Sequence, residues 1–219
     1  AHIFHLFPRV TNLNLAHDVT LQSNFLARLP ASVSHIRLLN LEGIKSLDIS
    51  TARSLVDRCP DLEAIRVWEH ITNDSLCILS NLSKLTNIEF IRCNHITDIG
   101  ITGILKVRKN LEALQFDRCD NITEGTLDII RKSSFCGTLK KLRIDNCTSI
   151  VNETKIARLL KKCTKLVAFS CAGNASYKSP VSTKVVEVYS NIHRTKLTAP
   201  NIYRCETMTQ ANLLMPAQH

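Results

Sequence analysis

Apolar residues recur along this chain in a nine-residue phrase that has leucine at position one, leucine or isoleucine at position four, an apolar residue at position six and cysteine at position nine. Three copies match in full: Leu85–Cys93, Leu111–Cys119 and Leu139–Cys147. Four further copies carry substitutions: Val10–Asp18, Val33–Leu41, Leu62–His70 and Leu166–Asn174. The chain is therefore built from about seven copies of one structural unit.

Alternation within the phrase predicts a short strand, because positions four and six point to one side of a strand and positions five and seven to the other. A helical pattern follows each phrase; over residues 96–105 it has apolar residues at 96, 101, 104 and 105, and either Thr97 or Asp98 is suited to be its N-cap. Repeats of 20 to 29 residues with this phrase indicate a leucine-rich-repeat solenoid. We expect an α/β arc over residues 1–174, with parallel strands on the concave face and helices on the convex face.

From residue 175 the phrase is lost. Residues 184–189 have the pattern of one more strand, and a solenoid needs a cap over its last exposed core. We expect residues 175–219 to be a cap or degenerate repeat followed by a tail, which could also reach back over the concave face.

The turn after the cysteine carries a recurring motif. Asn94-His95-Ile96-Thr97-Asp98 and Asp120-Asn121-Ile122-Thr123-Glu124 follow two of the full phrases, and Cys59 and Cys163 stand just before the next phrases. In these features the chain resembles the cysteine-containing leucine-rich repeats of F-box substrate receptors, over about residues 10 to 174. The resemblance implies a substrate-recognition part of a ubiquitin-ligase receptor, or a relative without an F-box such as an adaptor or assembly factor, some of which are mitochondrial. The F-box helices themselves are not in this sequence.

Nine cysteines would allow a disulfide framework, but Cys93, Cys119 and Cys147 occupy one position of the repeat. A small buried thiol suits a tight turn at that position, so reduced cysteines and a cytoplasmic or nuclear protein are the favoured interpretation. No run of 18 or more apolar residues is present, which predicts no transmembrane segment.

The formal net charge is +9, which favours a partner with an acidic or mixed apolar and acidic surface. Part of the excess lies at similar places in successive predicted helices and would form a basic edge, made of Lys106, Lys109, Arg131, Lys132, Lys161 and Lys162, with Arg108 between the first two. Such an edge could bind nucleic acid or an anionic membrane, although no aromatic residues lie between the charges to stack on bases. A solvated helix face explains the same pattern.

Outward positions of the strands form rows across the concave face. Row five contains Asn14, Arg37, Arg66, Glu89, Gln115, Arg143 and Ser170; row seven contains Ala16, Leu39, Trp68, Ile91, Asp117, Asp145 and Ala172; row eight contains His17, Asn40, Glu69, Arg92, Arg118, Asn146 and Gly173. Neighbouring strands lie about 4.8 Å apart, so members of a row can touch. The predicted partner-binding residues are Arg37, Leu39, Arg66, Trp68, Ile91, Arg92, Arg118 and Arg143.

Trp68, the only tryptophan, would form an apolar patch with Leu39 and Ile91. An exposed aromatic beside arginines has the composition of a binding hot spot, although it could also simply cover the sheet. Arg66 has Glu89 as its cross-strand neighbour, which predicts an ion pair. Arg37 and Arg143 have no acidic neighbour in row five and are expected to meet an acidic partner.

Asp117 and Asp145 would repel one another, and a metal ion could relieve this, but Arg92, Arg118 and Arg143 lie close enough to do so. His70 and the segment Cys93-Asn94-His95 have residue types that bind zinc, yet no C-x-x-C pairing accompanies them. We find no phosphate loop, nucleophile elbow or catalytic triad, so we expect neither a cofactor nor an enzyme. The expected function is protein binding through the concave face. A regulator of a nucleotide-hydrolysing partner is a further alternative without a specific residue to support it.

Overall fold

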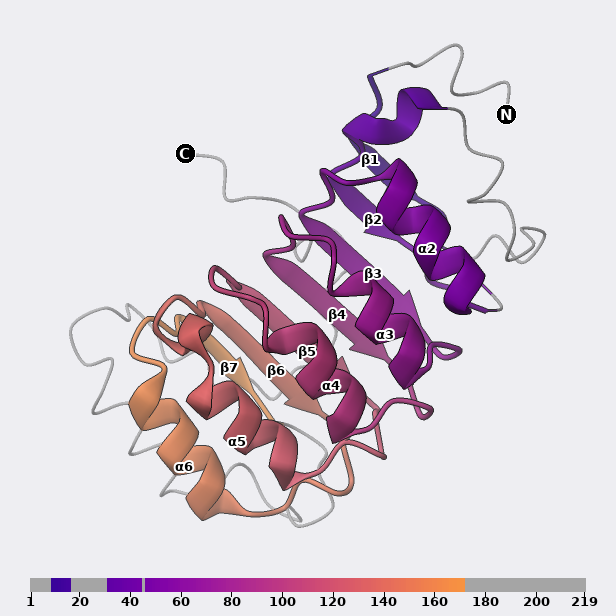
Figure 1. The fold of residues 1–219 in the computed structure, drawn as a ribbon. Coiled ribbons are helices and arrows are strands. Elements are labelled where there is room, and N and C mark those ends of the chain that lie inside the picture. Colours follow the sequence, from indigo (N-terminus) through magenta and orange to yellow (C-terminus); the bar gives the residue numbers. More distant parts are fainter. Residues whose placement is uncertain (1–8, 17–30, 45, 172–219) are drawn as a thin grey trace.

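A computed structural model describes residues 9–16, 31–44 and 46–171, and they contain one parallel sheet (Figure 1). Its strands are β1 (Asn12–Asn14), β2 (Leu38–Asn40), β3 (Ala64–Trp68), β4 (Asn87–Ile91), β5 (Ala113–Asp117), β6 (Lys141–Asp145) and β7 (Ala168–Ser170). Each strand pairs in parallel with the next one in the chain, in the order β1 to β7. Parallel neighbours require a crossover connection. Each crossover here leads from the carboxyl end of one strand to the amino end of the adjacent strand.

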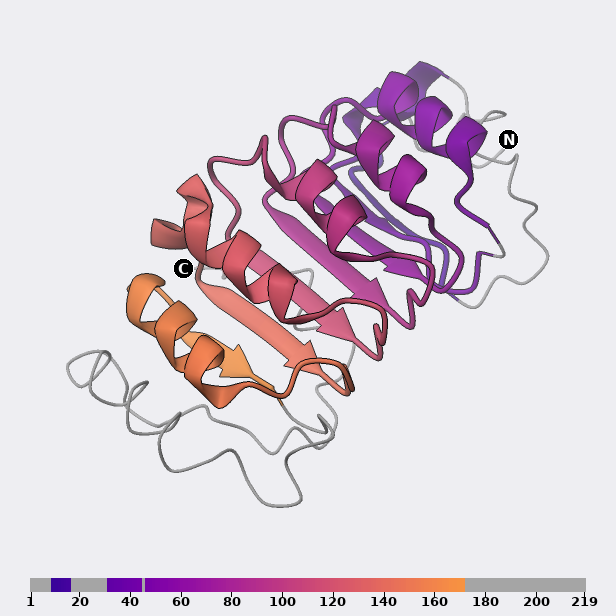
Figure 2. The same ribbon diagram turned by 60° about the horizontal axis from the view of Figure 1, so that its bottom comes forward.

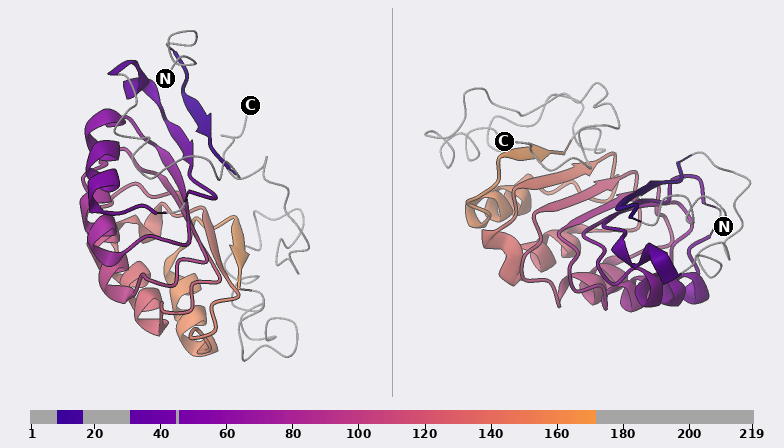
Figure 3. Two further views of the ribbon diagram at one scale, coloured as in Figure 1. Left: turned by 90° about the vertical axis from the view of Figure 1, so that its right-hand side faces the viewer. Right: turned by 90° about the horizontal axis from the view of Figure 1, so that it is seen from above.

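Helices fill these crossovers and cover one face of the sheet. They are α2 (Ile49–Arg58), α3 (Asn73–Leu79), α4 (Asp98–Leu105), α5 (Glu124–Lys132) and α6 (Glu153–Lys162), with the 3-10 turns η2 (Ala31–His35) and η3 (Ser134–Gly137). Packed helices need about 8–10 Å and strands only about 4.8 Å, so the double layer bends with its strands on the inside. The helices lie side by side in one layer in Figure 2, and the bend is visible in Figure 3. The predicted α/β class, with parallel strands and helices over one face, is confirmed.

Caps at the helix N-termini also tie successive repeats together. Thr97 is the N-cap of α4, as predicted, and its Oγ1 accepts a hydrogen bond from Ile99 N (3.3 Å). Asp98 then reaches the next repeat, where its Oδ1 accepts from Thr123 N (2.9 Å) and Thr126 Oγ1 (2.5 Å). Burial of Asp98 opposes its charge, but these hydrogen bonds outweigh that effect and lower the pKa of Asp98.

The core lies between the sheet and the helices, and the phrase positions four and six fill it. Phe90 and Phe116 are fully buried and stack with ring centroids 5.5 Å apart. The cysteines at position nine are buried and free, and the thiols of Cys93 and Cys147 each donate to the carbonyl oxygen two residues earlier (3.3 Å in both). A small thiol can thus turn inward at the strand end and hydrogen-bond the backbone there.

Position eight of the phrase adopts a left-handed backbone in five consecutive repeats, if the phrase of the second repeat is counted from Ile36, as the strand pairing below requires. Its members are Gly43 (φ 87°), Glu69 (φ 51°), Arg92 (φ 53°), Arg118 (φ 54°) and Asn146 (φ 53°). This conformation is uncommon for residues other than glycine. It bends the chain sharply after each strand, so that position nine returns to the core.

The predicted frame of the second repeat is wrong by three residues. Leu39 pairs with Leu13 and Ile65, which are position-four residues, and it is 0% exposed in the core. The phrase therefore starts at Ile36 rather than Val33. Both starts supply apolar residues at the required spacing, and an odd shift exchanges the two faces of a strand. Row five thus contains Asn40 in place of Arg37, and row seven contains Glu42 in place of Leu39.

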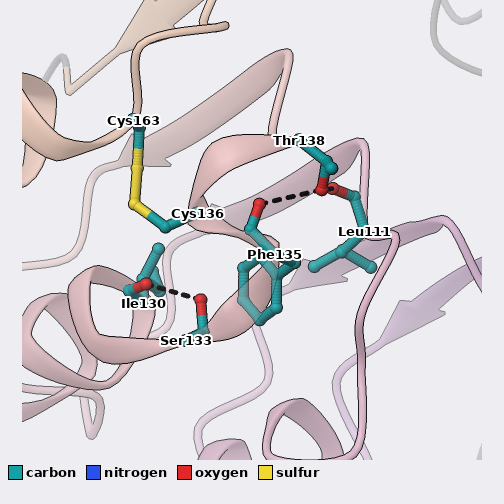
Figure 4. The surroundings of a disulfide bond; sticks show 7 residues. All are labelled: Leu111, Ile130, Ser133, Phe135, Cys136, Thr138 and Cys163. Carbon is teal, nitrogen blue, oxygen red and sulfur yellow. Dashed lines mark hydrogen bonds between the residues drawn. A yellow bond between two sulfur atoms is a disulfide. The ribbon is translucent and has the colours of Figure 1, made fainter.

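Two of the cysteines form a disulfide, contrary to the expectation of reduced thiols throughout. Cys136 in η3 is bonded to Cys163, the C-cap of α6, with the Cα atoms 4.9 Å apart (Figure 4). Each stands three residues before the start of a phrase, so the repeat itself brings the two side chains together. Six other cysteines of the described chain are free, among them Cys59, whose pKa burial raises to about 11.

Within the ranges described, the structure contains no helix that is both long and apolar enough to cross a membrane. The expected boundary after residue 174, the strand over residues 184–189 and the tail lie outside the described residues.

Candidate functional site on the open face of the sheet

Rows five and seven lie on the face of the sheet that carries no described helix, which we call the open face. Several of their members are nonetheless buried: Arg66, Glu89, Gln115, Ile91 and Asp145. Strand register aligns Arg66 with Glu89, Glu89 with Gln115, and Gln115 with Arg143 in row five. It likewise aligns Trp68, Ile91, Asp117 and Asp145 in row seven. Each row is therefore a continuous line of side chains, in which neighbours lie 23 to 28 positions apart in the chain.

Arg66 is the centre of a buried ion triad. Its Nη2 lies 2.9 Å from Glu89 Oε1, which confirms the predicted pair, and its Nη1 lies 3.3 Å from Glu42 Oε2. Burial raises the pKa of Glu89, and the positive charges of Arg66 and Arg143 oppose the rise. Held by two carboxylates and only 7% exposed, Arg66 serves the sheet itself. The sequence missed Glu42 because the shifted frame left it out of the rows.

Trp68 lies outside the core and is half-buried on the open face. The Arg92 guanidinium carbon lies 5.2 Å from the centroid of its ring, within cation–π distance. Ile91 borders Trp68 across the strand pair and is 6% exposed. With Leu39 in the core, the apolar patch is reduced to Trp68 and Ile91, and Arg92 covers part of the indole.

Carboxylates further along row seven are already paired. Arg143 Nε forms an ion pair with Asp145 Oδ2, and Ser170 Oγ donates to Asp145 Oδ1 (2.7 Å). Asn146 Nδ2 donates to Asp117 Oδ1 (2.8 Å). Arg143, predicted to meet an acidic partner because row five offers it no acidic neighbour, thus has an acidic neighbour in row seven. The described residues include no group of three or more His, Cys, Asp or Glu side chains arranged as metal ligands.

Arg37 lies at the start of β2 rather than on the open face. Its side chain is largely exposed, and its Nη1 lies 3.6 Å from Glu63 Oε1. The shifted frame of the second repeat explains both this error and the one at Leu39.

The basic edge follows the carboxyl ends of three helices. Lys106 caps α4, Lys132 ends α5, and Lys161 and Lys162 end α6; all four are exposed, as is Lys109. Cations are stabilised at helix C-termini by the helix dipole, which gives these lysines a structural reason to be there. Arg131 pairs with Asp128 (3.3 Å).

Arg108 does not belong to this edge. It is 3% exposed, and its Nη2 donates to the carbonyl oxygens of Leu79 and Ser80 (3.0 Å each). Burial lowers its pKa to about 10. The prediction that this arginine contributes to an exposed basic edge is wrong.

A hollow of about 400 Å³ opens at the carboxyl ends of β3, β4 and β5; its charged and titratable lining consists of Glu69, His70, Arg92, His95, Arg118 and Asp120. We call it the strand-end hollow. The rings of His70 and His95 stack with centroids 6.1 Å apart. Arg92 and Arg118, both predicted to bind a partner, meet here because position eight points them away from the strands. The histidines were considered only as zinc ligands, and the repeat position after each strand end is the signal that could have grouped them.

The chain is similar to a curated yeast protein and to a chain in a solved yeast complex. No family model matches the chain. The protein called Antagonist of mitotic exit network protein 1, from Saccharomyces cerevisiae, is 24% identical over 168 residues, covering 68% of this chain and 30% of that protein. The crystal structure of the Rad7 and Elc1 complex in yeast contains a similar chain, with a TM-score of 0.59 and 19% identity over 74% of this chain and 42% of that one. This chain thus spans less than half the length of either protein, and the structural likeness shows a shared fold.

Proposed function

We propose that this chain is a leucine-rich-repeat solenoid of the cysteine-containing type, and that it binds a protein partner through the open face at Trp68, Ile91 and Arg92. The observation that supports this most is the placement of Trp68. A lone tryptophan stands outside the core on a rigid sheet, with an arginine over its ring. Tryptophan and arginine are the residues most enriched among binding hot spots.

The partner segment would lie along row seven and replace Arg92 or pack beside it on the indole. Its apolar side chain would face Trp68 and Ile91, and its acidic groups would face Arg92 and Arg118. Arg66 and Arg143 are excluded from this role because Glu42, Glu89 and Asp145 already hold them. The proposal does not include catalysis: each residue that it assigns on the open face has a binding role.

The finer proposal is that the bound partner is a substrate presented for ubiquitylation, or else a component that the protein helps to assemble. The fold shared with a chain of the Rad7 and Elc1 complex, and the sequence likeness to an antagonist of the mitotic exit network, support a regulatory binding protein inside the cell. The free buried thiols of Cys93, Cys119 and Cys147 agree with an intracellular location, whereas the disulfide between Cys136 and Cys163 is the contrary observation.

Site-specific crosslinking tests the proposed surface. A photoreactive aromatic amino acid replacing Trp68, which is half-buried and outside the core, should capture a partner that the same group at Ile99, 77% exposed on the helical layer, does not. The captured protein is then purified and its affinity measured. Trp68→Ala should weaken binding by about 2 kcal/mol, or roughly 30-fold, because truncating a central hot-spot residue typically has at least this effect.

Ile99→Ala is the matched control and should leave the affinity unchanged. Thermal stability of Trp68→Ala should stay close to that of the wild type, because the indole is not part of the core. Unfolding of Trp68→Ala would mean that the residue is structural, and an unchanged affinity would remove it from the binding surface. In cells that express the whole protein, a receptor role predicts ubiquitin on the captured partner, and an adaptor role predicts capture without it.

A further inference from the structure

The strand-end hollow has a lining that favours negatively charged ligands. Its donors come from three successive strand ends: His70 after β3, Arg92 and His95 after β4, and Arg118 after β5. Arg92 and Arg118 share position eight of the repeat and the same left-handed backbone conformation. Adjacent strands are about 4.8 Å apart, a separation at which two arginines can bind one oxyanion together.

The two carboxylates of the hollow are engaged elsewhere or only loosely held. Asp120 Oδ1 accepts hydrogen bonds from Thr148 N (3.3 Å) and Thr148 Oγ1 (2.9 Å), which direct it toward the following repeat. Glu69 lies 3.7 Å from both Arg92 Nη1 and His70 Nε2, beyond the distance of a normal N–H···O hydrogen bond. Arg118 is exposed and makes no ion pair with a residue that the structure describes. Its guanidinium donors are therefore open to a ligand.

We propose that the strand-end hollow binds an oxyanion carried by the partner, either a carboxylate or a phosphate monoester. This proposal rests on the proposed function, because the carrier is the protein segment that lies on Trp68. Arg118 binds the oxyanion directly, and Arg92 connects the two places, since it lies over Trp68 and also lines the hollow. The hollow would fix the position of the segment, while Trp68 supplies apolar contact.

Arg118 supplies the charge that the hollow offers to an oxyanion. Asp120 is held by Thr148, and Glu69 lies beside Arg92 and His70. Neither carboxylate forms an ion pair with Arg118, so an incoming oxyanion need not displace one.

A single charged group suits this hollow better than a polynucleotide. Binding along a nucleic acid needs a row of cations facing successive phosphates, and stacking platforms for the bases. The strand-end hollow has two arginines flanked by Glu69 and Asp120, and the nearby indole of Trp68 has Arg92 over its ring.

Small probes test the hollow separately from the partner. The full chain is titrated with the methylamides of N-acetylaspartate, N-acetyl-O-phosphoserine and N-acetylserine, and the histidine ring protons are followed by NMR. The two acidic probes should shift the ring-proton resonances of His70 and His95, and the neutral probe should not. Whichever acidic probe binds more tightly identifies the source of the oxyanion.

The variant Arg118→Gln with His95→Gln should weaken acidic-probe binding by about tenfold or more, because it removes one charged donor and one ring of the lining. Arg53→Gln with Arg158→Gln, two exposed helix positions, is the matched control and should bind as the wild type does. Trp68→Ala should also retain probe binding. Equal probe binding by Arg118→Gln/His95→Gln and wild type, or no binding of either acidic probe at millimolar concentration, would overturn the proposal.

Failure of the proposed function gives a different result. If Trp68→Ala leaves partner affinity unchanged while probe binding still depends on Arg118, the oxyanion site in the hollow is supported and the proposed partner surface at Trp68 is wrong. If Trp68→Ala weakens the partner but the probes do not bind, the hollow alone is wrong.

Discussion

Replacing Arg108 with leucine tests how a single buried cation holds two repeats together. Besides Nη2, which donates to Leu79 and Ser80, Nη1 donates to the carbonyl oxygen of Leu82, and Nε donates to that of Ile104 (3.2 Å). The guanidinium therefore joins the end of α4 to the end of α3 and the turn that follows. Other repeats have Val33, Cys59, Leu82, Cys136 or Cys163 at the corresponding position, so a leucine fits the repeat pattern.

The magnitude follows from the carbonyl groups left behind. Leu79 O and Leu82 O also accept backbone hydrogen bonds from Leu82 N and Leu85 N, so they keep one partner. Ser80 O and Ile104 O depend more on the arginine, and each buried carbonyl left unsatisfied costs about 1–3 kcal/mol. The apolar surface of the new leucine offsets part of this loss. We expect Arg108→Leu to lower the free energy of unfolding by about 3 kcal/mol.

Urea denaturation followed by the fluorescence of Trp68, the only tryptophan, measures this change. Lys109→Leu is the matched control, because Lys109 is exposed beside Arg108, and it should change the free energy by less than about 0.5 kcal/mol. Arg108→Lys should also destabilise, since one ammonium group cannot reach carbonyl oxygens on both repeats. If Arg108→Leu unfolds at the same urea concentration as Lys109→Leu, the reasoning that the guanidinium joins the repeats is refuted.

Three further predictions concern the core, a cap and the disulfide. Leu39→Ala should lower the free energy of unfolding by about 2–5 kcal/mol, as for other buried leucines. A near-neutral effect in urea denaturation would mean that Leu39 does not lie in the core. The pKa of Asp98 is lowered in the folded state, so its stabilisation is complete above the unfolded value of about 3.9 and is lost as the pH falls through the folded pKa. Wild type should therefore exceed Asp98→Asn in unfolding free energy at pH 6, and the difference should shrink as the pH falls below about 3.9. Equal stability at pH 6 would show that this carboxylate does not stabilise the cap. The double variant Cys136→Ala/Cys163→Ala should have a lower thermal midpoint than the oxidised wild type and the same midpoint as the reduced wild type. A thiol titration that finds both cysteines reduced in the native protein would refute the disulfide.

Local features of the chain could be predicted because each repeat is built from neighbouring residues. The phrase from Leu111 to Cys119 contains its own strand alternation and its own inward-turning thiol, and Thr97 caps a helix that begins at the next residue. Repetition then fixed the parallel order of the strands. The position of Trp68 outside the core followed from the same alternation, since Ile65 and Val67 on either side of Arg66 are in the core.

The sequence alone could not decide the frame of the second repeat, where Val33 and Ile36 both satisfy the apolar spacing. The frame became clear only from the pairing of Leu39 with Ile65, and it brought Glu42 beside Arg66. A wrong frame exchanges the buried and open faces of a strand, which is why Leu39 and Arg37 were both misplaced.

The sequence by itself determined the repeating strand and helix, the capped helix starts and the apolar core, because these depend on residues within one repeat. The tertiary structure decided the ion triad around Arg66, the burial of Arg108, the bond between Cys136 and Cys163, and the strand-end hollow. Each of these brings together groups from different repeats, about 25 residues apart in the chain. Their meeting depends on strand register and on the direction that the backbone gives each side chain, and neither can be read from the pattern of one repeat.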